Sequence, residues 1–523
     1  MYRKGQKGSV TVFLSLTCML FLSLICTVIE SARIQGAKAQ TVNILSMANV
    51  SLLSEFEKEL LERYEIFALD GAYGSEKFQK KKLKTRLETF LLMNTDPKKE
   101  ESGLGCFDPW NLELTDTEID KYTLLTDGKG EAFYQQAVSF MKQNIGVLAV
   151  EELMEYQDSV DEIRNYQRSY EEIQKNNEGA LKELEQAKEQ KLEALESEAE
   201  KIKAENAEVS SGEVLQIAGG DTAMAEAKEK ANPLTEIAKL RKKSILELVL
   251  QDKELSGKTI AAKGLPSRGI LQKGNLSVEK EHTGILANVL FREYLMRYFS
   301  NYLEHEEEDV LKYQAEYLLG GKKSDKENLK YVVNRLLLIR EGMNYLYCVS
   351  DSQISAQANT LAASLTGFLG IPALTAATGQ AILLAWAYGE SLIDVRTLLN
   401  GGRVPLNKSA GDWLLSLENL GHLMEILKSG NNGKQEGMNY SEYLRILLHM
   451  GNLSSQKMRA LDLIQLDLQK NGGLPDFQVK NCIVAVKTSA RWNCGSVFLR
   501  LPNQVMRMQG INTDFVQNGS ISY

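Results

Sequence analysis

The chain has 523 residues, enough for two to four domains, and a formal net charge of −8. Its first seven residues carry three positive charges and no acid, so the remainder carries −11. That balance argues against nucleic acid as a partner, because nucleic-acid-binding surfaces are basic.

An uncharged run from Val10 to Ile29 is the first element in chain order. Twenty residues of helix span about 30 Å, the thickness of the hydrocarbon core of a bilayer. We therefore predict a transmembrane helix over residues 8–30, whose hydroxyl groups donate to carbonyls one turn back. The side chains expected to form this membrane anchor are Val10, Phe13, Leu14, Leu20, Phe21, Leu24, Ile25 and Ile29.

The charges beside this run predict its topology. Arg3, Lys4 and Lys7 precede it, so the positive-inside bias places residues 1–7 in the cytoplasm and the body outside the cell membrane. The alternative is a cleaved signal peptide. Signal peptides have shorter apolar regions of about 7–15 residues and end at a small-residue cleavage site, which this run lacks.

Two charged residues follow the run at helical spacing. Glu30 and Arg33 are three residues apart, so we expect a local ion pair, with pairing to a neighbouring subunit as the alternative. Apolar residues then continue at helical spacing as far as Phe67 without a proline. The pattern predicts one long helix from about Val10 to about Leu69.

Several motifs along the chain resemble a known family. Residues 8–16 (GSVTVFLSL) and 30–33 (ESAR) resemble the opening of TadE/TadG-like proteins of tight-adherence (Tad) pilus systems. These N-terminal residues, together with five later segments, are similar to an uncharacterised family of large membrane-anchored proteins. That family occurs in Clostridia-type, Gram-positive bacteria and accompanies Tad pilus loci. Those segments are 64–70 (YEIFALD), 311–321 (LKYQAEYLLGG), 385–390 (AWAYGE), 394–396 (DVR) and 443–448 (YLRILL).

The resemblance implies a location and a system and no reaction. It implies an extracytoplasmic accessory protein whose partners are membrane lipid and other single-pass pilus or secretion components. The chain departs from pilins at the processing site, because Phe13 stands five residues beyond Gly8, where many pilins carry glutamate. Processing after Gly8 and homo-oligomerisation are left open.

Residues 151–250 form the next segment, a charged helical hairpin. From 151 to 210 there are 18 acidic and 8 basic residues, and nine of the fifteen a and d positions counted from Leu153 are apolar. This pattern favours a projecting solvated helix that folds back onto residues 222–250. A coiled coil with a partner and a disordered segment are the alternatives.

Residues 251–475 are expected to form a helical body. Candidate helices lie near 278–304, 306–319, 325–348, 353–370, 372–399, 410–429, 439–449 and 454–470. The stretch from Leu361 to Ala387 is a second candidate for a membrane segment. Its glycines and polar residues, and Pro372 at the start of a new helix, favour two short buried helices instead.

Alternating residues predict a small β element. One or two strands are expected near 111–126, within a mixed segment at 31–150, and two more within residues 476–523, before and after Arg491. The strands at the two ends of the exterior part are expected to pair. Cys482 and Cys494 bracket the last strand pair, so a disulfide between them is a further hypothesis.

No motif predicts an enzyme. Glu390 and Asp394 lie four residues apart on one helix face, and such paired carboxylates can perform acid–base work or hold a cation. More often they form ion pairs.

No metal-ligand spacing and no cofactor motif occurs. We therefore expect a mainly α protein with a small antiparallel β element that is not an enzyme and needs no metal or cofactor. A surface hydrolase or wall-polymer-binding protein that uses the Glu390/Asp394 face is the alternative.

Overall fold

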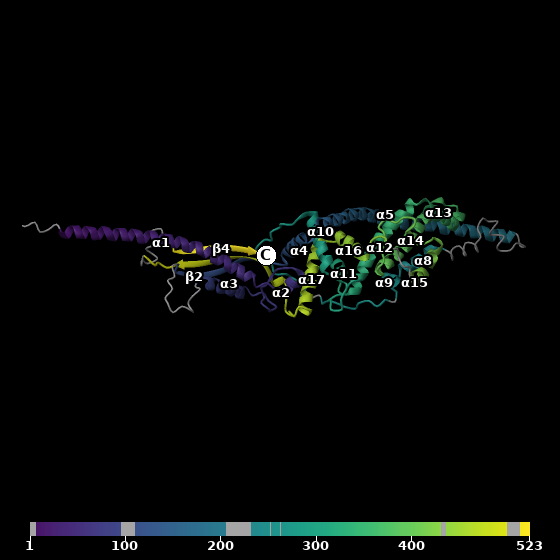
Figure 1. The fold of residues 1–523 in the computed structure, drawn as a ribbon. Coiled ribbons are helices and arrows are strands. Elements are labelled where there is room, and N and C mark those ends of the chain that lie inside the picture. The colour runs from purple at the N-terminus through teal and green to yellow at the C-terminus, as the bar shows by residue number, and fades with distance from the viewer. Residues whose placement is uncertain are drawn as a thin grey trace, which may run out of the picture. The chain divides into compact units, whose positions relative to one another are not determined.

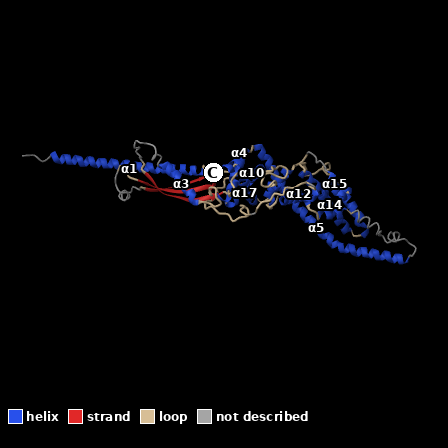
Figure 2. Cartoon of the chain, turned by 90° about the horizontal axis from the view of Figure 1, so that it is seen from below, coloured by secondary structure: helices blue, strands red, loops and turns tan. Residues whose placement is uncertain are grey.

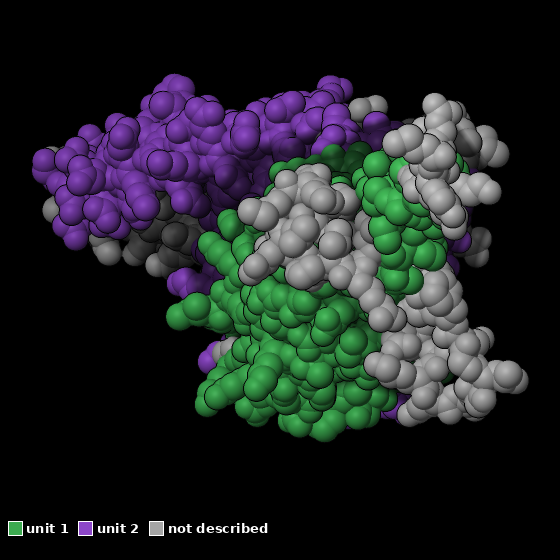
Figure 3. Space-filling view, turned by 90° about the vertical axis from the view of Figure 1, so that its left-hand side faces the viewer, with its two compact units in different colours: residues 1–140, 263–282, 460–523 green, residues 141–262, 283–459 purple. Residues whose placement is uncertain are grey.

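The computed structural model describes residues 7–95, 110–205, 232–251, 253–261, 263–429, 436–498 and 513–523. The fold is mainly α-helical with a small antiparallel sheet, as the sequence predicts. It divides into two compact units (Figure 3). Unit 1 comprises residues 1–140, 263–282 and 460–523, and unit 2 comprises 141–262 and 283–459. Each unit therefore combines segments that are far apart in the sequence. The sequence had suggested domains that each consist of one continuous segment.

Unit 1 is built on helix α1 (Lys7–Leu53) and a four-stranded sheet (Figures 1 and 2). Strand β3 (Cys482–Cys494) lies at the centre and pairs along one edge with β2 (Leu112–Leu124). Its other edge pairs with β4 (Asp514–Ser522) and with the short β1 (Leu69–Asp70). The predicted pairing of the two ends of the exterior part is confirmed.

Helices α1 and α3 (Lys80–Thr95) pack on one face of this sheet. Alternate residues of β3 point into this core, and Trp492 is its largest fully buried side chain. Leu45 and Leu52 of α1 and Leu87 of α3 belong to the same core. The apolar face of α1 beyond residue 33 is therefore covered by protein.

Three further helices contribute to unit 1. They are α2 (Lys58–Tyr64), α4 (Asp127–Asn144, which crosses into unit 2) and most of α17 (Leu453–Lys470). In α4, residues 128–130 have positive φ, so the regular helix begins near Glu131.

The prediction of one helix to Leu69 is wrong. α1 ends at Leu53, and the chain turns before α2, which ends at Glu65 with a left-handed φ of 54°. The turn lets Leu60 and Tyr64 pack in the core and brings β1 to the edge of β3. Neither proline nor glycine marks this break, so the local sequence gives no sign of it.

Residues 476–523 contain β strands, as predicted, but the expected division of the first strand at Arg491 is wrong. β3 runs without a turn through Arg491 and Trp492, preceded by the 3₁₀ turn η3 (Val479–Asn481), and its partner is β4. Cys482 and Cys494 consequently stand at opposite ends of one strand, about 40 Å apart at 3.3 Å per residue. Both thiols are free and buried, so the proposed disulfide is wrong. Cys106 lies outside the described residues.

Unit 2 is a helical body. Its helices α10–α16 follow the predicted order, and α12, α13, α14 and α16 lie within four residues of the expected bounds. The other three are shorter than predicted: α10 by six residues at each end, and α11 and the η2–α15 segment by eight residues at the start. Their bounds are α10 (Gly284–Tyr298), α11 (Gln314–Gly320), α12 (Asp325–Ser350), α13 (Ser352–Thr366), η1 (Gly367–Leu369), α14 (Pro372–Leu399), η2 (Glu418–His422), α15 (Leu423–Ser429) and α16 (Tyr440–Met450).

Local capping explains where several of these helices begin. Asp351 accepts hydrogen bonds from the backbone N–H groups of Gln353 and Ile354 and so caps α13. Pro372 begins α14, as predicted. The stretch from Leu361 to Ala387 thus forms parts of two helices of the body, and the interpretation as a second membrane segment is wrong.

The long helix α5 (Val147–Glu205) packs on this body through its first half. Val160, Ile163 and Tyr170 are buried against α12, α14 and α16. The short helices α8 (Pro233–Arg241) and α9 (Ile245–Val249) also join this core. Beyond Asn177, which donates a hydrogen bond to the carbonyl of Ala377, no described α5 side chain is buried.

Candidate functional site

The apolar run of α1 has no protein cover. The predicted anchor side chains are all exposed, from 43% at Ile29 to 72% at Leu20. Thr17 and Thr27 donate hydrogen bonds to the carbonyls of Phe13 and Ser23 one turn back, as predicted, so their hydroxyls are satisfied within the helix. Among the described helices, α1 is the one long and apolar enough to cross a membrane. Arg3 and Lys4 lie outside the described residues.

Within one turn of helix beyond Ile29, the chain forms what we call the exit clamp: Glu30, Arg33, Trp110 and residues 495–498. Glu30 and Arg33 form the predicted local ion pair, with 2.6 Å between Oε1 and Nη2, and both residues are buried. Arg33 also donates hydrogen bonds of 2.6 Å to the carbonyls of Trp110 and Gly495. One ion pair therefore joins α1 to the residues that flank β2 and β3.

The carboxylate of Glu30 completes the exit clamp. It accepts hydrogen bonds from the backbone N–H groups of Val497, at 3.2 Å, and Phe498, at 3.0 Å. Charge-assisted bonds of this kind are about twice as strong as neutral ones. Because both charges are buried and paired, the clamp fixes the loop at 495–498 against the helix where the apolar run ends.

Trp110 packs against α1 beside this ion pair. Its indole ring lies against Gly36, and a Cβ atom at position 36 would stand 2.6 Å from Trp110 Cζ3. Gly36 is thus the position where α1 lets an aromatic ring approach its backbone. Sequence reasoning missed Trp110, Gly495, Val497 and Phe498, because nothing local in a single sequence connects residues so far apart.

The second candidate site, at Glu390 and Asp394, is a buried ion network. Asp394 contacts Nζ of Lys408 at 2.6 Å and Nε of Arg340 at 3.0 Å. Glu390 pairs with Lys408 and accepts hydrogen bonds from the backbone N–H groups of Leu414 and Leu415. All four charged side chains are at most 3% exposed, so two cations balance two carboxylates inside the core.

The electrostatics of this network suit structure better than proton transfer. Burial by itself would raise the pKa of Asp394. The positive charges of Lys408 and Arg340 lower this pKa by more, so its net shift is downward. Burial raises the pKa of Glu390, partly offset by Lys408. Acid–base work needs a carboxylate that reaches substrate. Neither carboxylate lines the pocket described below.

A separate cluster ties α5 and α8 to α12. The Tyr170 hydroxyl donates a 2.6 Å hydrogen bond to Glu341, whose carboxylate also lies 3.6 Å from Arg241. The Arg241 guanidinium stacks over the Tyr388 ring at 4.4 Å. These contacts explain why the first half of α5 is held firmly on the body.

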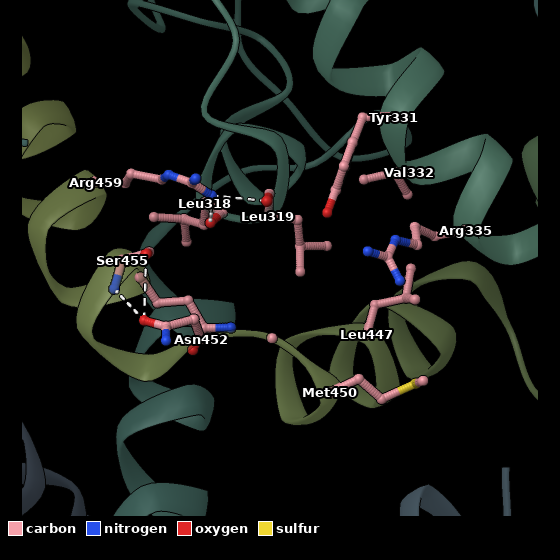
Figure 4. A pocket seen from close by; sticks show the side chains of 12 residues that line it. Leu318, Leu319, Tyr331, Val332, Arg335, Leu447, Met450, Asn452, Ser455 and Arg459 are labelled. Atoms are coloured by element: carbon pink, nitrogen blue, oxygen red, sulfur yellow. Dashed lines mark hydrogen bonds between the residues drawn. The ribbon is translucent and has the colours of Figure 1, made fainter. Parts of the chain in front are cut away.

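A pocket of about 280 Å³ lies among α11, α12, α16 and the start of α17. Figure 4 shows Arg335 and Arg459 on opposite sides of this cavity. The guanidinium of Arg459 donates hydrogen bonds to the carbonyls of Leu318 and Leu319 at the end of α11. Asn452 accepts a hydrogen bond from the N–H of Ser455 and so caps α17. The lining residues include no carboxylate, histidine or cysteine.

Glu316 and His449 are among the other buried titratable groups of unit 2. Burial raises the pKa of Glu316 to about 7, although Tyr440 donates it a 2.6 Å hydrogen bond. Burial lowers the pKa of His449 to about 3, assisted by Arg292 and Arg164. In the parts of the chain covered by the structure, no group of three or more His, Cys, Asp or Glu side chains is placed to hold a metal ion.

Comparison with known proteins adds a family to this geometry. Residues 223–494 match the model of a family of unknown function, DUF5702. This range includes the ion network, the pocket and β3, and leaves out α1 and β2. Comparison with curated proteins and with solved structures finds no match. Since the matched range covers more than half of the 523 residues, the chain belongs to the DUF5702 family of unknown function.

Proposed function

We propose that the protein is a single-pass, membrane-anchored accessory or structural component of a Tad-like pilus or secretion apparatus, with its body outside the cell membrane. The observation that carries the proposal is α1. Its apolar run is uncovered, and directly beyond it the exit clamp ties the helix into a folded unit. Lipid is the environment that would cover such a run.

The outer half of α5 is the proposed contact surface for partner proteins. Between Asn177 and Glu205 its charged residues are exposed wherever their side chains are described, while four leucines are partly covered. These leucines are Leu181, Leu184, Leu192 and Leu195. A charged helix with a narrow leucine stripe suits contact with another helix.

Topology is tested first. Protease added to intact cells should degrade the body and leave residues 1–7 protected, and the chain should stay with membranes after a carbonate wash. A body that resists protease in intact cells but is degraded in lysed cells would refute the proposed orientation. Release of the intact chain into the wash would refute the anchor.

Partner contact is tested by photo-crosslinking in native membranes. A photoreactive residue replaces Glu196 on the outer half of α5, and a matched control replaces Glu327 on α12, which is equally exposed. We expect Glu196 to capture identified pilus or secretion components and Glu327 to capture none. A deletion of 151–220 is a poorer test, because it also removes the buried Tyr170. Equal capture of such components at both positions, or capture at neither, would count against the proposed surface.

A further inference from the structure

The exit clamp places one exposed apolar side chain at a defined height above the apolar run. Phe498 is 45% exposed, and its backbone N–H lies 3.0 Å from the Glu30 carboxylate. Glu30 directly follows Ile29, the last residue of the run. The position of Phe498 relative to a membrane is therefore set by the position of Ile29.

The height follows from helix geometry. At 1.5 Å per residue, Glu30 and Arg33 lie about 1.5 and 6 Å beyond Ile29 along the axis. Helical side chains lean towards the N-terminus, so the Glu30 carboxylate is not carried outward. The headgroup layer adds about 5–7 Å on each side of the hydrocarbon core. With Val10–Ile29 in the core, the clamped backbone at 495–498 falls within that layer.

We infer that residues 495–498 lie in the headgroup layer and that the Phe498 ring contacts lipid at the membrane interface. The inference rests on the proposed membrane anchor and adds a second, non-helical contact with lipid. Lipid is the occupant because the clamp holds the exposed Phe498 at headgroup depth, directly beyond a run whose last residues, Val28 and Ile29, are 61% and 43% exposed. An exposed phenylalanine at this depth exchanges water for the membrane interface.

The same geometry assigns no lipid contact to Trp110. Its ring lies against Gly36, about 10 Å beyond Ile29, which is at or above the outer limit of the headgroup layer. The two aromatic residues of the clamp are therefore distinguishable by depth.

The test uses the full-length chain in vesicles of phosphatidylglycerol and phosphatidylcholine. A photoreactive phenylalanine analogue, p-benzoylphenylalanine, replaces Phe498 in one preparation and Phe67 in the other. Phe67 is a matched control: it is 38% exposed and stacks on Tyr523, at the end of β4 away from the exit clamp. After illumination, lipid adducts are counted by mass spectrometry, and limited proteolysis confirms that both variants are folded.

We expect at least tenfold more lipid adducts at position 498 than at position 67. Equal yields at the two positions, in a chain that resists a carbonate wash, would overturn the inference and leave the anchor intact. So would adducts from 498 to protein alone in native membranes. A chain that washes off the vesicles would refute the anchor, and this inference with it.

Discussion

Replacing Asp394 by asparagine tests whether the buried ion network holds unit 2 together. The change keeps the shape of the side chain and removes its charge. It removes the carboxylate that pairs with the buried Arg340 and leaves the buried Lys408 paired with Glu390. Leaving one buried charge without its partner typically costs about 3–5 kcal/mol. Since 1.4 kcal/mol is a factor of ten, amides that exchange through unfolding of unit 2 should exchange about 100- to 4,000-fold faster.

The assay is hydrogen exchange of α12 and α14 peptides, resolved by mass spectrometry. Asp161→Asn is the matched control, because Asp161 forms an exposed ion pair with Arg164 and should change stability by less than about 0.5 kcal/mol. A second test restores the charge balance. The Asp394→Asn, Lys408→Met double variant should lose far less stability than the sum of its two single variants.

The outcome that refutes this reasoning is specific. If Asp394→Asn accelerates exchange by less than tenfold, or if the double variant is simply additive, the network is not a desolvated unit. Glu390 and Asp394 would then be open to water, and a chemical role for their helix face would return to consideration.

Three further predictions concern single positions. Glu316 has a pKa of about 7 in the folded protein, above its unfolded value, so it binds more protons when folded and its contribution to stability is lost as the pH rises from about 4.5 to 7. Across that window the free energy of unfolding of the unchanged protein should fall by about 3 kcal/mol in urea unfolding, and Glu316→Gln should abolish this fall. An unchanged pH profile in the variant would contradict this assignment. Gly36→Ala should destabilise unit 1 by about 1–3 kcal/mol despite better helix propensity, because its Cβ meets the Trp110 ring; an increase in the midpoint of urea unfolding would be the contrary result. Cys482 and Cys494 should both be alkylated in denatured, unreduced protein, and an intact mass two protons lighter would instead reveal a bridge.

Local patterns predicted the helical body well. α14 begins and ends at Pro372 and Leu399, the bounds expected from the sequence, because a proline at the first turn and a dense apolar period are local signals. The Glu30–Arg33 pair was predictable for the same reason, since i,i+3 spacing fixes the distance between its members.

Tertiary contacts decided what the sequence could not. The turn after Leu53 follows from the pairing of β1 with β3, and no residue near Leu53 indicates it. Two strands were expected before and after Arg491, yet β3 runs on through Arg491 and Trp492, whose indole is buried in the core. In the exit clamp, Arg33 reaches Gly495 across 462 residues of sequence, a contact that no local pattern encodes.

The exit clamp also determines what kind of anchor α1 can be. A flexible tether would need a hinge between the apolar run and the folded unit, but α1 is continuous from Lys7 to Leu53. Gly36, the weakest helix former near the boundary, is covered by the Trp110 ring. Glu30 and Arg33 fix the helix to the ends of β2 and β3 within one turn of Ile29. Any tilt of the apolar run must therefore move the sheet of unit 1 with it, so the proposed anchor would set the orientation of that sheet as well as its position.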